Sequence, residues 1–301
     1  MRQTHTVLLT LLRAGLLGGV TLVCSLAGAQ AAPGGVMKQD SATSGKTDVA
    51  SEGFATAAAA KKEDANDATE AKIQAGGLSA SGNSRSLALT SSATVRARRG
   101  ANEFSAAAAV NYGRSAAKSA DPMETTIENY QGKLRYDRFV SEPLALFASL
   151  SARRDRFQGL NLRLNLDPGL AYYFIQNPKH QLWGEAGYDL QYDVRRDEAI
   201  DVALADNIIL AKTKTRHNAR LFAGYRNSLN QAVTFNTGVE YLQGLAETKF
   251  WRFNWDVGLT AALAAKFSLA TTFSLRYDNQ PLPGIKSTDT LTALNLVYQL
   301  L

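Results

Sequence analysis

The sequence predicts an all-β fold, an antiparallel transmembrane β-barrel of about 12 strands preceded by a signal peptide and a disordered tether. Three observations predict it. Apolar residues recur with a period of two in many successive segments after Ile73. Short connections alternate with longer ones between these segments. Residues 1–29 have the composition of a secretory signal, and no later apolar run is long enough for a membrane-spanning helix.

Residues 1–29 are the first expected element, a cleaved signal peptide. They contain Arg2 and Arg13, no acidic residue and two apolar runs, and they end in Ala27-Gly28-Ala29. Small residues at this position are typical of a signal peptidase site, so we expect cleavage before Gln30.

The charge and the cysteine content narrow the class of protein. The chain has 33 Lys and Arg against 27 Asp and Glu, a net charge of +6, which does not indicate a nucleic-acid partner. The only cysteine, Cys24, lies inside the signal, and the residue before it is not the small one that a lipoprotein site requires. The exported chain must therefore be stable in an oxidising compartment without disulfides.

Residues 30–71 are expected to form a low-complexity periplasmic tether. They are rich in Ala, Gly, Ser, Thr, Asp and Lys, and Phe54 is their one aromatic residue. Such a segment cannot bury enough apolar surface to offset the entropy of ordering. A plug or a peptidoglycan-binding helix over "FATAAAAKKEDANDATEAK" is the alternative, although an isolated helix of that length is only marginally stable.

Residues 72–301 carry the alternating segments of the expected outer-membrane β-barrel. In 251–261, apolar Trp251, Phe253 and Trp255 alternate with Arg252, Asn254 and Asp256. The segments 160–167, 182–194 and 267–278 show the same pattern. Their lengths, roughly 9 to 14 residues, are those of tilted strands that cross a bilayer.

The connections alternate in size. Compact turns occur at 98–102, 140–144, 176–180, 227–231 and around Lys266. Longer connections lie between them, at "SAAKSADPMET", "RRDRFQGLN", "RRDEAIDVALADN", "GLAETK" and "NQPLPGIKST". Short turns on one side and long loops on the other are typical of barrels in the Gram-negative outer membrane, where the short turns face the periplasm.

The strands of a soluble β-sandwich or a soluble barrel would also alternate between apolar and polar residues. The composition of the two faces distinguishes these folds from a membrane barrel. A soluble fold would show a polar face rich in Lys and Glu and an apolar face of Val, Ile and Leu. Here Lys is scarce on the polar face, and aromatic residues such as Tyr172, Phe174, Tyr188 and Tyr192 concentrate on the apolar face near strand ends. This distribution favours lipid outside and a polar lumen.

The barrel segment resembles a family of outer-membrane proteins of unknown function, labelled salt-induced outer membrane protein, YdiY-like. The resemblance is carried by "SASGNSRSLAL" (79–89), "LRYDRF" (134–139), "LNLRLNLDPGLAYYF" (160–174), "LWGEAGYDLQYD" (182–193) and "YDNQPLPGIKSTDTLTALNLVYQL" (277–300). It implies an outer-membrane β-barrel and an association with salt or osmotic stress, and it supplies no catalytic residues. The tether lies outside the similar region.

Charged residues of both signs occupy the polar face and are the candidate lining of the lumen. They are Arg96, Lys133, Arg135, Asp137, Arg163, Asp167, Glu185, Asp189, Asp193, Arg216, Arg220, Arg226, Glu240, Arg252, Asp256, Arg276 and Asp278. The near balance of charge on a narrow barrel suggests a lumen closed by ion pairs, or a thin, weakly selective pore. Two functions stay open, a narrow passive channel for small solutes or ions and a structural barrel of the stressed envelope.

An outer-membrane lipid-modifying enzyme is the disfavoured alternative, because it would need a serine activated by a histidine. After the signal only His180 and His217 remain, and the same-face neighbours of His217 are Thr215 and Ala219. The carboxylates Glu185, Asp189 and Asp193 are spaced too widely along one strand to converge on a metal ion. We therefore expect no catalytic residues, metal or cofactor.

The expected partners are lipids and proteins of the outer membrane. Arginines at outer strand ends are candidate contacts for lipopolysaccharide phosphates, with solvated pairing to loop carboxylates as the alternative. These are Arg153, Arg154, Arg156, Arg195 and Arg196. Leu294, Leu296, Tyr298 and Leu300 alternate in the last strand, as in the signal read by the barrel assembly machinery. We expect this strand to pair with "KIQAGGLSA" and close the barrel.

Overall fold

The computed structural model of the chain describes residues 67–82, 84–118 and 120–300. The expected signal peptide with Cys24, residues 30–66 of the expected tether, and Leu301 lie outside the described residues. Residues 67–71, which we expected to belong to the tether, form the start of the first strand instead.

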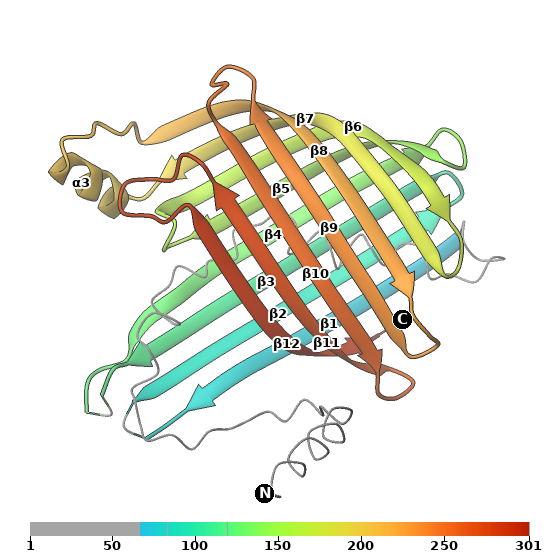
Figure 1. Cartoon of the computed structure of the whole chain (residues 1–301), viewed down its shortest axis with the longest axis horizontal. Coiled ribbons are helices and arrows are strands. Elements are labelled where there is room, and N and C mark those ends of the chain that lie inside the picture. The colour runs from blue at the N-terminus through green and yellow to red at the C-terminus, as the bar shows by residue number, and fades with distance from the viewer. Residues whose placement is uncertain (1–66, 83, 119, 301) are drawn as a thin grey trace, which may run out of the picture. The chain divides into compact units, whose positions relative to one another are not determined.

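Twelve antiparallel strands form one closed barrel, which confirms the predicted fold class (Figure 1). Each strand pairs with its neighbours in sequence, and the last pairs with the first. The strands are β1 (Asp67–Ala80), β2 (Arg85–Arg99), β3 (Asn102–Ala116), β4 (Glu124–Phe139), β5 (Leu144–Asp155), β6 (Leu160–Gln176), β7 (His180–Arg195), β8 (Thr213–Ser228), β9 (Val233–Gly244), β10 (Trp251–Ala262), β11 (Phe267–Asp278) and β12 (Thr288–Gln299).

The barrel closes through a short ladder between β1 and β12, the two ends of the sheet in sequence. Its register runs from Lys72 opposite Gln299 to Ala75 opposite Leu296. Just beyond the ladder, a Cβ on Gly76 would lie 2.5 Å from the carbonyl oxygen of Leu294. The absence of a side chain at Gly76 therefore permits the close approach of β1 to β12.

The two faces of the sheet are inverted relative to a soluble protein. Polar side chains fill the inside, where Asn129, Asp189 and Glu240 are fully buried. Large apolar side chains lie on the outside, and Leu221 and Leu294 expose more than half of their surface. An exterior that exposes large apolar side chains around a hydrogen-bonded interior is the arrangement that a bilayer stabilises.

Aromatic pairs lie on the outer face near the strand ends. The ring centroids of Trp251 and Tyr277 are 4.7 Å apart, and those of Phe267 and Tyr298 are 4.9 Å apart. Of the proposed closing signal, Leu294, Leu296 and Leu300 are exposed and Tyr298 contacts Phe267. Rings at these positions match the aromatic girdles of membrane barrels.

The strands are longer than the sequence predicts, from 12 to 17 residues. The connection expected at "RRDRFQGLN" shrinks to residues 156–159, because β5 continues to Asp155 and β6 begins at Leu160. The connection expected at "RRDEAIDVALADN" contains an unpredicted helix, α3 (Asp197–Ala205). This helix stands out from one end of the barrel in Figure 1. Among the described residues no helix is long and apolar enough to cross a membrane.

Candidate functional site in the barrel lumen

The charged residues that the sequence assigns to the lumen lie on the inner face of the strands. Arg96, Lys133, Arg135, Asp137, Asp167, Glu185, Asp189, Asp193, Arg220, Glu240, Arg252, Asp256 and Arg276 are buried. Arg163, Arg216, Arg226 and Asp278 are half-buried on the same face. The structure brings many of them into direct contact in two clusters, a central cluster around Glu185 and a second one in the half of the barrel from which helix α3 projects.

The central cluster links strands that are not neighbours in the sheet. Arg135 on β4 donates from Nη1 to Oε1 of Glu185 on β7, at 2.7 Å. Arg220 on β8 donates from Nη1 to the other oxygen of Glu185 at 2.7 Å, and from Nε to Glu240 at 2.6 Å. Asp137 accepts from Arg135 at 2.7 Å. The two guanidinium groups and three carboxylates compensate each other's burial, which an isolated ion could not do.

Inner-face aromatic rings support this cluster, and the sequence analysis missed them. The guanidinium carbon of Arg135 lies 4.1 Å from the ring centroid of Phe147. Arg220 lies 5.6 Å from the ring of Phe222, which packs on Trp183. Phe222 follows Arg220 by two positions, so the period of two already places both side chains on the same face of β8. This spacing could have predicted the contact. These contacts are favourable cation–π interactions in a desolvated setting.

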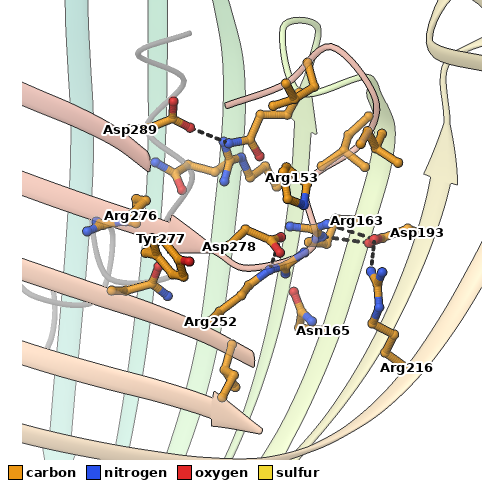
Figure 2. A pocket seen from close by; sticks show the side chains of 18 of the residues that line it. Arg153, Arg163, Asn165, Asp193, Arg216, Arg252, Arg276, Tyr277, Asp278 and Asp289 are labelled. Atoms are coloured by element: carbon orange, nitrogen blue, oxygen red, sulfur yellow. Dashed lines mark hydrogen bonds and ion pairs between the residues drawn. The ribbon is translucent and has the colours of Figure 1, made fainter. Parts of the chain in front are cut away.

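The second cluster, the outer cluster, consists of Arg163, Asp193, Arg216, Arg252 and Asp278, and Figure 2 shows its side chains converging. Arg163 donates to both oxygens of Asp193, at 2.7 and 2.8 Å. Arg252 donates to Asp278 at 2.6 Å and reaches Gln191 on β7 at 2.8 Å. The contact to Gln191 again joins strands that are not neighbours.

Arg216 is held more loosely than the other arginines of the outer cluster. Its Nη1 lies 3.7 Å from Asp193 and its Nε 3.6 Å from Glu247 in the connection between β9 and β10. Its guanidinium lies 4.3 Å from the ring centroid of buried Phe250. Glu247 also accepts a hydrogen bond from Lys214, and this bond, together with the charges of Lys214 and Arg216, lowers the pKa of Glu247 below its ordinary value of 4.5.

Among the described residues, inner-face side chains line at least two cavities. The outer cavity, of about 80 Å³, is lined by the outer cluster, by Lys133, Arg153, Arg195 and Arg276, and by residues of the connection 279–287. The small-residue cavity, of about 70 Å³, is lined by small side chains such as Thr90, Ser92, Ala109, Thr272 and Ala293. Gln131 on β4 lines both cavities, so its side chain lies between them.

Neither histidine contacts a serine in the described part of the chain. His180 Nδ1 lies 2.9 Å from the hydroxyl of Tyr225, and His217 Nδ1 is hydrogen-bonded to the hydroxyl of Tyr188. Both contacts are on the outer face of the barrel. A tyrosine hydroxyl on a histidine ring anchors the ring and supplies no nucleophile of the serine–histidine kind.

The carboxylates weighed as metal ligands point to separate partners. Asp189 accepts from the side-chain amides of Asn165 at 2.9 Å and Asn218 at 2.7 Å. Glu185 and Asp193 belong to the central and outer clusters described above. Within the ranges that the structure describes, no group of three potential ligands converges on one point.

The arginines proposed to bind lipopolysaccharide do not share one surface. Arg153 and Arg195 are buried on the inner face, because β5 extends past Arg153, β7 extends as far as Arg195, and the alternation continues up to both residues. Arg154 is exposed on the outer face. Arg156 pairs with Glu128 at 3.4 Å, and Arg196 pairs with Glu198 at 2.8 Å. Only Arg154, Arg156 and Arg196 keep a position from which they could reach a lipid headgroup.

The apolar exterior, the closed ladder and the ion-paired interior define a membrane-spanning β-barrel protein. The chain belongs to the family described as protein of unknown function, DUF481, whose model matches residues 73–300. The uncharacterized protein YdiY of Escherichia coli K12 is 25% identical over 234 residues, which cover 77% of this chain and 83% of that protein. The YdiY-like resemblance seen in the sequence is thereby confirmed.

The solved structures to which the chain is similar include a porin and an outer-membrane channel. The NanC porin is similar over 76% of this chain and 100% of its own, with a TM-score of 0.48 and 10% identity. An outer-membrane channel of Pseudomonas putida F1 is similar over 77% of this chain and 94% of its own, with a TM-score of 0.42 and 14% identity.

Proposed function

We propose that this protein is a narrow, passive channel of the Gram-negative outer membrane that admits small hydrophilic solutes or ions. The observation that carries the proposal is that one residue, Gln131, lines both the outer cavity and the small-residue cavity, so the two cavities are adjacent. Together they trace a polar path along one side of the lumen. Each cavity holds only a few water molecules, so the path suits small solutes.

The packing of the lumen is uneven, and this unevenness supports a path. On the side of β4 to β9 the central cluster fills the interior with long, paired side chains. On the side of β1 to β3 and β10 to β12, short side chains such as Ser92, Ala109 and Ala293 leave the small-residue cavity. In this proposal the paired, charged side chains stay fixed, and solutes pass along the side of the lumen that is lined by short residues.

A structural barrel of the envelope is the second candidate. It is favoured by the contacts Arg135–Glu185 and Arg252–Gln191, which brace the lumen between strands that are not neighbours. The association with salt or osmotic stress belongs to this proposal and rests on the family resemblance. If it holds, the protein should rise in abundance in outer-membrane fractions as sodium chloride is added to the medium. Unchanged abundance would count against it.

The proposed partners are outer-membrane lipids and, during biogenesis, the barrel assembly machinery. Arg154, Arg156 and Arg196 are the remaining candidate contacts for lipopolysaccharide. A lipid-modifying enzyme stays the disfavoured alternative, since both histidines contact tyrosines. Lipid hydrolysis by the refolded protein that disappears in His217→Ala would favour the enzyme over the channel.

Planar-bilayer conductance of the refolded protein tests the proposed function. A channel of this width should give small, stepwise ion currents in neutral salt. A correctly folded barrel that gives no current at any voltage or salt concentration would favour the structural barrel. Folding is checked independently by the resistance of the closed barrel to unfolding in detergent on an unheated gel.

A further inference from the structure

The outer cavity has a chemical character of its own. Basic residues dominate its charged lining, which comprises Lys133, Arg153, Arg163, Arg195, Arg216, Arg252, Arg276 and Lys286 against Asp193, Asp278 and Asp289. The connection 279–287 adds apolar Pro281, Leu282 and Ile285. A concave site with convergent cations and an apolar rim is suited to a small anion.

Most of the arginines around the cavity have carboxylate partners close by. Arg163 is satisfied by Asp193, and Arg252 by Asp278. Arg276 donates to Asp256 at 2.5 Å. Arg153 is hydrogen-bonded to Asp155. These pairs compensate much of the positive charge around the cavity. The remaining positive charge therefore lies on the other arginines of the lining.

Of these arginines, Arg195 and Arg216 are the two whose positive charge is least compensated, since Arg216 has only the two long ion pairs described above. Arg195 donates from Nη1 to the backbone carbonyl of Ala211 at 2.7 Å, and it has no carboxylate within ion-pair distance among the described residues. Arg216 lies beyond hydrogen-bond distance of Asp193 and Glu247, and its buried Nε has no hydrogen-bond acceptor in the part of the chain that the structure describes. A buried donor without an acceptor is costly, and an incoming oxyanion would relieve that cost.

We propose that the outer cavity binds a small oxyanion, of the size of phosphate or a short-chain carboxylate, through Arg195 and Arg216. Planar guanidinium groups match the oxygens of phosphate and carboxylate groups in two-point contacts. A cavity of about 80 Å³ holds only a few water molecules, which excludes large polyanions. The inference rests on the proposed function in one respect, that an anion bound here would stand in the conduction path.

Isothermal titration calorimetry on the refolded protein tests the site, with inorganic phosphate and butyrate titrated separately at constant sodium chloride. We expect saturable binding of at least one anion, and the two titrations distinguish a phosphate site from a carboxylate site. Arg216→Gln and Arg195→Gln should each weaken binding about tenfold or more, since each removes a charge-assisted contact. Arg216→Lys should recover part of the affinity. The matched control is Arg154→Gln, one position from Arg153 but exposed on the outer face, and it should bind as the wild type does.

Folding is monitored by the thermal transition of each variant. Anion binding to the folded wild type should raise its Tm as concentration increases, and this measurement needs no variant. No saturable heat and no rise in Tm for either anion, or wild-type affinity in both Arg216→Gln and Arg195→Gln, would overturn the site. Binding without bilayer currents would refute the channel and leave the site standing. Bilayer currents without anion binding would refute the site and leave the channel standing.

Discussion

Arg135 on β4 and Glu185 on β7 form an ion pair at 2.7 Å although two strands separate them in the sheet. Glu185 also accepts from Arg220, so one carboxylate compensates two buried guanidinium groups. Glu185→Gln should lower the free energy of unfolding by about 3 to 5 kcal/mol, because two buried guanidinium groups each lose one of their two carboxylate partners. Urea unfolding of the refolded barrel in lipid vesicles measures the loss.

The matched control for this change is Glu128→Gln. Glu128 pairs with Arg156 at 3.4 Å, and the Arg156 side chain is 49% exposed. Exposed pairs contribute about 0 to 1 kcal/mol, so this variant should unfold close to the wild type. Equal losses in the two variants would mean that the central cluster does not stabilise the barrel.

The outer face is predicted to lie in lipid, and Leu221→Arg tests this. Leu221 is 56% exposed at the middle of β8, so an arginine there should cost about 2 to 4 kcal/mol in a bilayer. The control is Leu229→Arg, in the turn after β8, where the leucine is 51% exposed and outside the strands. Since the two leucines have similar exposure, equal small effects in both would contradict a membrane-spanning face.

Packing inside the barrel predicts a steric effect at Gly224 on β8. A Cβ at this position would lie 2.2 Å from the ring of Trp183. Gly224→Ala should therefore lower the free energy of unfolding by about 1 to 3 kcal/mol through overpacking. At Gly132 on β4 the nearest atom to a new Cβ is 3.9 Å away, so Gly132→Ala should cost little. Denaturant unfolding compares the two, and a larger loss in Gly132→Ala would refute this packing.

The connection between β9 and β10 should respond to acid through Glu247. Its pKa is lowered by the hydrogen bond from Lys214 and by the charges of Lys214 and Arg216, so the ionised form is the one favoured in the folded protein. The stabilisation is complete above the ordinary value of 4.5 and is lost as pH falls through the lowered pKa.

Hydrogen exchange measures this response at the amide of Phe250, which donates to the carbonyl of Glu247 at 2.8 Å. After correction for the intrinsic rate, its protection should fall on acidification in the wild type. In Glu247→Gln it should be weaker at neutral pH and insensitive to acid in this range. An acid-insensitive wild type would refute the assigned role of Glu247.

The barrel could be predicted from sequence because the period of two is a local property. Alternation in one strand, such as 251–261, already shows which side chains face inward. The strand ends were less predictable. Arg153 and Arg195 look like loop residues beside other charges, yet both continue the inward alternation of extended strands. Helix α3 was read as a loop because its helical segment is short and carries no strong capping signal.

The contacts within the lumen could not be predicted from a single sequence. Arg135 and Glu185 are 50 residues apart, and their meeting depends on the curvature of the closed sheet. The two cavities depend on the same curvature and on the short side chains at Ser92, Ala109 and Ala293, which look unremarkable in sequence. Balanced charge indicated that ion pairs would form, but not which residues would form them.

Single-channel recording of Gln131→Trp beside the wild type tests the central proposal most directly. Gln131 lines both cavities, so an indole there should obstruct the path between them. The matched control is Tyr130→Trp, which enlarges the neighbouring side chain on the outer face, where Tyr130 is 40% exposed. We predict small stepwise currents in the wild type and in Tyr130→Trp, and currents at least severalfold smaller in Gln131→Trp. Absence of current in the folded wild type, or equal currents in all three proteins, would contradict the proposed channel.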